Sequence, residues 1–275
     1  MITEISAELD TWVRKTDKAF RALKEKGCSV HGVKPFYTNI RAFDANRKKV
    51  MILGINPGGD READKAERTN GYIDRILDPK GHPFCSIISG HNGEYGAEKQ
   101  RYATRLRSYL SALLGWDDHP SADTRFCLLP IGNLIPFRSP DVSILEDEAW
   151  FTGVGLGFEL IELSKPQRVL LIGTGTDRSC WGAIQQYIQL NRCTPVQTNG
   201  VDPEVPFCKS CSVLWQGSDQ RTEFIAIPHP KFQIRNEDYS RQLKALRDGF
   251  GEWKAMSLDN PYASSSVRLT KRVHV

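Results

Sequence analysis

The 275-residue chain contains no long hydrophobic run. A membrane-spanning helix needs roughly 20 consecutive apolar residues, and no such stretch occurs. The first residues, MITEISAELDTWVRK, alternate charged and apolar side chains where a secretory signal peptide would have an apolar centre. We therefore expect a cytoplasmic protein that makes no membrane contact. We also expect a monomer.

The usual phosphate-binding fingerprints are also missing. The stretch "VMILGINPGGD", residues 50–60, is an apolar run that ends in a glycine-rich turn. Val50 to Leu53 suit a buried parallel strand, and such a turn commonly holds a phosphate. Neither GxGxxG nor GxxxxGK[ST] is present in it. The turn therefore needs another explanation.

Cysteine pairs that could form a metal centre are scarce. The seven cysteines are an odd number, and the one CxxC motif joins Cys208 and Cys211, with Cys180 and Cys193 upstream. A single CxxC without a clean second pair is a weak zinc signal. We expect reduced, buried thiols, no metal and no cofactor. The net charge of +4 permits a polyanionic partner without requiring one.

Hydrophobic periodicity indicates an α/β protein. Strand-like runs alternate with segments of helical spacing, which favours a three-layer α/β/α fold with a central, mostly parallel four-stranded sheet. We expect one domain over residues 1–260, with insertions at 60–81 and 193–222 and a mobile basic tail at 261–275. Helices are predicted at 3–26, 98–114, 145–163 and 237–256, and strands at 50–56, 126–135, 168–173 and 223–230.

The predicted helix at 98–114 carries three arginines, Arg101, Arg105 and Arg107. A row of basic side chains on a helix is commonly a solvated face. We favour the solvated face here.

Polar residues follow three of the predicted strands. Asn56, Asn133 and His229 come at or just after apolar runs. In parallel sheets, ligands bind beyond the carboxyl ends of the strands, so we expect these residues at one rim. Taken singly, each has a structural interpretation: Asn56 and Asn133 can hold turns, and His229 can be a packed side chain.

Together and in this order, the motifs resemble those of the uracil-DNA glycosylase superfamily. The resemblance extends from about Val50 to Trp253. It includes "GINPG" at 54–58, "HPFCS" at 82–86, "GNLIPFRSP" at 132–140 and "HPKFQIRN" at 229–236. The histidine–proline pair at His119 is excluded as the histidine motif because it precedes Asn133 and follows no predicted strand.

The resemblance implies a role for each matching residue. His229 would stabilise the departing base, Asn133 would bind the pyrimidine edge, and Asn56 would position the attacking water. Asn56 stands where efficient uracil enzymes have an aspartate, so Asp60 is a candidate substitute. The remaining residues of the base site would be Gly54, Ile55, Pro57, Gly58 and Phe84, the last stacking on the base. Contacts to DNA would come from Gly59, Arg138, Ser139, Pro230, Lys231, Phe232, Arg235 and Asn236.

Gly58 also differs from the family pattern, because uracil enzymes place a tyrosine there, against carbon 5 of the base. The missing tyrosine leaves room for a substituent on carbon 5, so we favour a 5-modified pyrimidine as the substrate. Glucosylated hydroxymethylcytosine of phage DNA is an example, and a protein that removes it would serve antiviral defence. We expect a monofunctional DNA glycosylase that flips out its target base and leaves an abasic site. The alternatives are a uracil-DNA glycosylase of base-excision repair, a non-catalytic DNA-binding relative, and an unrelated nucleotide-handling α/β enzyme.

Overall fold

The computed structural model describes residues 5–38, 40–55, 97–116, 125–126, 128–139, 141–189, 193–197, 208–230 and 235–261. The part described includes the whole central sheet discussed below and the helices that cover it. None of the described helices is both long and apolar enough to cross a membrane.

The central sheet in the described part has six strands, in the order β3-β2-β5-β8-β7-β6. The four strands from β3 to β8 are mutually parallel, while β7 and β6 continue the sheet in antiparallel pairing. The mostly parallel sheet is thus confirmed, and the predicted number of four strands is wrong. The strand bounds are β2 Val50–Gly54, β3 Ile131–Asn133, β5 Arg168–Ile172, β6 Cys193–Gln197, β7 Lys209–Trp215 and β8 Arg221–Ile227.

The two additional strands lie in the segment 193–222, which was predicted to be an irregular insertion. In β7 the residues Cys211, Val213 and Trp215 are buried and alternate with partly exposed ones. This period of two is the burial pattern of a strand. A turn containing Gly217, with φ of +70°, then leads into β8, so β7 and β8 form a hairpin. At the far edge of the sheet, the register of β6 is irregular between Pro195 and Gln197.

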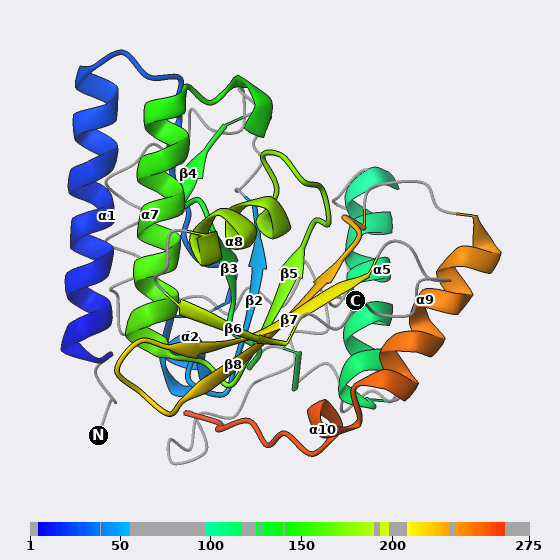
Figure 1. Cartoon of the computed structure of the whole chain (residues 1–275). Coiled ribbons are helices and arrows are strands. Elements are labelled where there is room, and N and C mark those ends of the chain that lie inside the picture. The colour runs from blue at the N-terminus through cyan, green and yellow to red at the C-terminus, as the bar shows by residue number, and fades with distance from the viewer. Residues whose placement is uncertain are drawn as a thin grey trace, which may run out of the picture.

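Helices cover both faces of the sheet, which confirms the three-layer α/β/α fold (Figure 1). Successive strand residues point to opposite faces, so Met51 and Leu53 join one hydrophobic core while Val50 and Ile52 join the other. The first core is closed by α1 Ala7–Glu25, α2 Ile40–Asn46, α7 Asp147–Ser164 and α8 Cys180–Gln189, and the second by α5 Ala97–Leu114, α9 Asn236–Gly249 and α10 Gly251–Lys254.

The predicted helices are confirmed within a few residues at their ends, with one exception. The last helix was expected to be continuous from 237 to 256. It is divided into α9 and α10 at Phe250, which has φ of −127°. Gly249 and Gly251 flank this position, and glycine weakens a helix because its backbone loses the most freedom on ordering. Trp253 of α10 is nevertheless buried in the second core.

A short two-stranded sheet lies beside the main one. It pairs β1 Gly32–Val33 with β4 Phe137–Arg138 in antiparallel fashion. An isolated bridge between Phe36 and Gly132 extends this pairing onto β3. The segment 32–38 therefore covers the free edge of β3. A 3₁₀ helix at Val142–Ile144 leads from β4 to α7.

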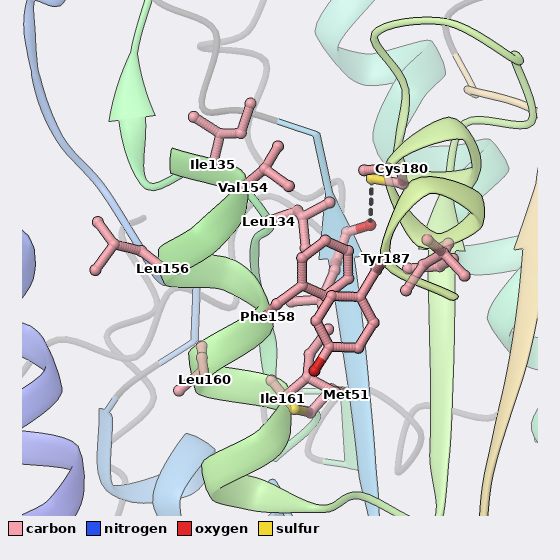
Figure 2. Close-up of a cluster of buried hydrophobic side chains, with 14 of the residues drawn as sticks. Met51, Leu134, Ile135, Val154, Leu156, Phe158, Leu160, Ile161, Cys180 and Tyr187 are labelled. Carbon is pink, nitrogen blue, oxygen red and sulfur yellow. Dashed lines mark hydrogen bonds between the residues drawn. The ribbon is translucent and has the colours of Figure 1, made fainter. Parts of the chain in front are cut away.

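Helix α7 packs very closely against the residues that follow β3. Figure 2 shows Leu134 and Ile135 lying against α7, next to Val154 and Phe158. A Cβ atom at Gly157 would stand 2.1 Å from the carbonyl oxygen of Leu134. Only a glycine therefore permits this approach of helix and strand backbone.

Replacement of Gly157 by alanine should test this close approach. Alanine is the better helix former, but its methyl group would force α7 away from Leu134, and overpacking typically costs about 1–3 kcal/mol. We expect Gly157→Ala to lower the free energy of unfolding by about that amount in urea titrations followed by circular dichroism. Gly155→Ala is the matched control, because a Cβ atom there meets nothing within 4 Å. It should be neutral or stabilising by up to about 1 kcal/mol, and equal losses in both variants would contradict the packing argument.

Candidate functional site

The candidate site lies at the carboxyl ends of the parallel strands. From β2 the chain passes first to β3 on one side and later to β5 on the other, so the strand order changes direction at β2. Ligands in open α/β sheets bind at such a switch point. Gly54, the last residue of β2, lies directly beside Asn133, the last residue of β3, in the sheet register.

His229 belongs to the same rim. It follows the end of β8 by two residues, and β8 is joined to β2 through β5. Its side chain is partly exposed. The prediction that Asn133 and His229 share one rim is therefore confirmed. The third residue of that prediction, Asn56, lies outside the described residues.

The side chain of Asn133 is buried and hydrogen-bonded to the backbone of a neighbouring segment. The residue is only 1% exposed, and its Nδ2 donates a hydrogen bond of 2.8 Å to the carbonyl oxygen of Lys34. Its backbone N–H donates to the carbonyl oxygen of Pro35, also at 2.8 Å. The side-chain Oδ1 is buried and accepts no hydrogen bond from the described residues. A buried acceptor without a partner is costly, which makes it a candidate ligand contact.

Two glycines allow the segment 34–37 and the Asn133 side chain to lie where they do. A Cβ atom at Gly132 would stand 2.7 Å from the carbonyl oxygen of Pro35, so only glycine lets the segment 34–37 lie on β3. A Cβ atom at Gly54 would stand 3.3 Å from Oδ1 of Asn133 and would cover it. Gly132 thus sets the position of the amide, and a side chain at position 54 would crowd its oxygen.

Tyr37 is a part of the site that the sequence reasoning missed. Burial raises the pKa of its hydroxyl, while a hydrogen bond from Asn133 and the nearby charge of Arg138 oppose this shift. The ammonium group of Lys34 lies 5.0 Å from the centre of the Tyr37 ring. Nothing in "VKPFYT" has the periodicity of a strand or helix, and no residue of this segment belongs to a recognised motif. Its proximity to Asn133 arises only through the fold.

The segment after β8 is held by an arginine from α5. Nη1 of Arg105 donates to the carbonyl oxygen of Pro230 at 3.4 Å, and its guanidinium lies 5.5 Å from the ring centre of Tyr239. Arg107 similarly lies 5.1 Å from the ring centre of Phe126. Both arginines are partly buried. The interpretation of this row as a solvated face is therefore wrong for Arg105 and Arg107.

The residues predicted to contact DNA differ in their accessibility. Arg235 and Asn236, at the start of α9, are exposed, and Arg138 is partly exposed. Ser139 and Pro230 are buried, and the hydroxyl of Ser139 donates to the carbonyl oxygen of Asp141 at 2.7 Å. These two residues therefore shape the backbone and do not present a side chain to DNA in this structure. Ile55 is partly buried against the first core.

The other predicted site residues lie outside the described residues. They are Asn56, Pro57, Gly58, Gly59, Asp60, Phe84, Lys231 and Phe232.

The two cysteines of the CxxC motif are not placed to bind one metal ion together. Cys208 belongs to the second core and Cys211 to the first, so they lie on opposite faces of the sheet. Burial raises the pKa of the Cys208 thiol to about 12, which disfavours the thiolate that binds metals. Cys180 is also buried, and its Sγ donates to the carbonyl oxygen of Leu53 at 3.4 Å (Figure 2). Among the described residues, no three His, Cys, Asp or Glu side chains are grouped to hold a metal ion.

No protein-family model matches the chain, and no curated protein matches it. The resemblance to the uracil-DNA glycosylase superfamily therefore rests on the sequence motifs and on where the structure places them. It remains a prediction.

Replacement of Gly54 by alanine should test whether Oδ1 of Asn133 is a ligand contact. The added methyl group would cover Oδ1, so a ligand that donates a hydrogen bond to this atom would lose it. The loss of such a bond, worth about 1–3 kcal/mol, corresponds to roughly fivefold to 150-fold weaker binding of an oligonucleotide substrate. Fluorescence titration with labelled oligonucleotides would measure it.

Gly175→Ala is the matched control for this variant. Gly175 follows β5 at the same rim, and a Cβ atom there would stand 3.4 Å from Ser179 and not near Asn133. We expect it to bind oligonucleotides as the wild type does. Equal affinity of Gly54→Ala and wild type would show that Oδ1 is not a ligand contact.

Proposed function

We propose that the chain is a DNA glycosylase that flips out a pyrimidine and hydrolyses its N-glycosidic bond, leaving an abasic site. The observation that carries the proposal is the buried Asn133 at the switch point of the sheet. Its Oδ1 lacks a hydrogen-bond partner among the described residues, and it shares a rim with His229. A base edge is the kind of polar, planar ligand that would supply the missing hydrogen bond.

Hydrolysis of the N-glycosidic bond requires a buried site that binds the flipped base. A base within a duplex cannot be reached until it is rotated out of the stack and bound by its Watson–Crick edge. As the glycosidic bond breaks, the sugar becomes cationic and the departing pyrimidine gathers negative charge. A histidine beside the base oxygen would stabilise that charge. His229 is the candidate for this role, and Asn133 is the candidate for binding the base.

The first exposed cation after His229 in the described part of the chain is Arg235. It precedes α9 and can meet a phosphate, while Glu237 and Asp238 in the first turn of that helix carry the opposite charge. Lys231 and Phe232, between His229 and Arg235, stay predicted contacts. A DNA substrate and the buried free thiols of the described cysteines are both in keeping with a cytoplasmic location.

The favoured substrate is a pyrimidine modified at carbon 5, such as glucosylated hydroxymethylcytosine of phage DNA, with a role in antiviral defence. The support is the absence of a bulky residue at Gly58 and Gly59. Uracil repair is the alternative substrate assignment. Asn56 in place of an aspartate favours a third candidate, a non-catalytic DNA-binding relative, because an amide cannot act as a general base.

One assay separates these candidates. Purified protein is incubated with oligonucleotides that carry uracil, cytosine, hydroxymethylcytosine or its glucosylated form, and alkali-labile sites are counted. We expect cleavage at the 5-modified base. Cleavage at uracil alone would assign the protein to repair, and binding without any cleavage would support the non-catalytic candidate.

Replacement of His229 by alanine tests the mechanism. Removal of one charge-stabilising donor typically costs about two to three orders of magnitude in rate, so base release should fall by that amount with the fold intact. His119→Ala is the matched control, because His119 also precedes a proline, and it should leave the rate nearly unchanged. Normal turnover in His229→Ala, measured in single-turnover reactions, would remove this residue from the mechanism.

Replacement of Gly58 by tyrosine tests the substrate. A tyrosine facing carbon 5 would collide with any group larger than hydrogen, so release of a 5-modified base should collapse while release of uracil falls much less. The effect must be measured as the ratio of kcat/KM for the two substrates. A ratio like that of the wild type, with both activities retained, would show that Gly58 does not face carbon 5.

A further inference from the structure

His229 stands between two prolines, Pro228 and Pro230, directly after β8. A proline ring fixes its own φ angle and restricts the residue before it to extended conformations. The tripeptide is therefore stiff. Both prolines are buried, while the histidine between them is partly exposed. In a stiff segment, the contacts that hold the two ends also set the position of the residue in the middle.

The structure holds this tripeptide on both sides through backbone carbonyl groups, since proline has no N–H to donate. On the side of β8, the carbonyl oxygen of Ile227 accepts from the N–H of Gly173 at 2.8 Å, which continues the pairing of β5 with β8. On the other side, the carbonyl oxygen of Pro230 accepts from Nη1 of Arg105 at 3.4 Å. The second contact is thus made by a side chain of α5.

The guanidinium of Arg105 is held in turn by an aromatic ring of α9, which lies beside α5 (Figure 1). Its central carbon lies 5.5 Å from the ring centre of Tyr239. That ring meets Tyr109 of α5 edge-on at 5.4 Å, and the buried Tyr109 hydroxyl donates to Gln242 of α9 at 2.6 Å. Arg105 therefore contacts the described chain on both sides of residues 231–234, and it joins the end of β8 to α9.

We propose that Arg105 is the positioning residue of His229. Through the carbonyl oxygen of Pro230, it holds the imidazole where the departing base gathers charge. This inference rests on the proposed function and adds to it a residue from outside the matching motifs. Donors that stabilise a transition state act best when they are in place beforehand, and a misplacement of about 1 Å can cost roughly a hundredfold in rate. Arg105 acts in this scheme only through His229 and does not contact the base.

Arg105→Gln removes the guanidinium and should slow base release. A substitution that only misplaces His229 affects the transition state and leaves the binding of DNA intact. We therefore expect kcat to fall at least about tenfold, the equivalent of one hydrogen bond from a charged donor, and KM to stay within about twofold of the wild type. A higher KM with unchanged kcat would show that Arg105 binds DNA directly and would overturn the proposal.

Arg107→Gln is the matched control for this variant. Arg107 lies on the same helix and is also partly buried, but its guanidinium lies 5.1 Å from the ring centre of Phe126. We expect it to keep the kcat of the wild type. An equal loss of kcat in both variants would show a general effect of charge or stability, and the positioning role would be rejected.

A double substitution decides whether Arg105 acts through His229. In Arg105→Gln combined with His229→Ala the imidazole is already missing, so the loss of Arg105 has nothing left to misplace. We expect the double variant to release the base at the rate of His229→Ala alone. A further fall of about tenfold or more would show that Arg105 acts independently of His229, contrary to the proposal.

The position of His229 can also be followed in the free protein, without a substrate. In protein labelled with ¹⁵N in its histidine rings, the signals of His229 are identified by their loss in His229→Ala. We expect these signals to shift in Arg105→Lys, which keeps the positive charge but loses the planar fork, and to stay in place in Arg107→Lys. His229 signals that stay in place in Arg105→Lys and in Arg105→Gln would overturn the proposal.

The two kinds of measurement separate this inference from the proposed function. If the wild type cleaves no oligonucleotide, the glycosylase proposal fails, and the histidine signals still decide whether Arg105 positions His229. If the wild type cleaves DNA and Arg105→Gln keeps its kcat, the positioning role is overturned and the glycosylase proposal stands.

Discussion

The placement of β3 depends on two backbone approaches that only glycines allow. On one side the carbonyl oxygen of Pro35 lies against Gly132, and on the other the carbonyl oxygen of Leu134 lies against Gly157 of α7. The strand itself has three residues, and within the described part of the chain it pairs in the central sheet with β2 alone. A strand this short gains little from sheet pairing alone. Its position, and therefore that of Asn133, is set by these two contacts.

This constraint has a chemical consequence for the site. The Asn133 amide is buried and held by the carbonyl oxygen of Lys34, so little of its freedom is left to lose when a ligand arrives. Preorganised polar groups in surroundings without water interact more strongly than the same groups in solution. The buried Oδ1 costs stability in the free protein. Binding sites commonly carry such a cost, because an acceptor kept free for a ligand cannot also be satisfied inside the protein.

Much of the fold could be predicted from the sequence, because its signals are local. The spacing of Leu9, Trp12 and Val13 identifies α1, and the apolar runs at 50–53 and 168–172 identify the two central strands. The strand β7 also has a local signal, the alternation from Cys211 to Trp215. The CxxC motif at the start of this segment masks that alternation, because its two cysteines belong to opposite faces of the sheet.

The candidate site was predictable only in part. Asn133 and His229 follow apolar runs, so their place on one rim follows from the rules of parallel sheets. Tyr37 and Arg105 have no such signal. The bond from Asn133 to Lys34 joins residues 99 positions apart, and that from Arg105 to Pro230 joins residues 125 positions apart. Contacts at these separations depend on the packing of whole layers, which no local pattern encodes.

The irregular register of β6 bears on how the protein behaves at high concentration. An unpaired sheet edge can add a strand from another molecule and so start aggregation. In β6, the outermost strand on its side in the described part of the chain, Pro195 has no N–H to offer and the ladder is displaced beside it. The opposite edge is covered by the segment 32–38. Neither edge therefore presents a regular ladder to a second copy, and the sheet is protected from growing beyond one molecule.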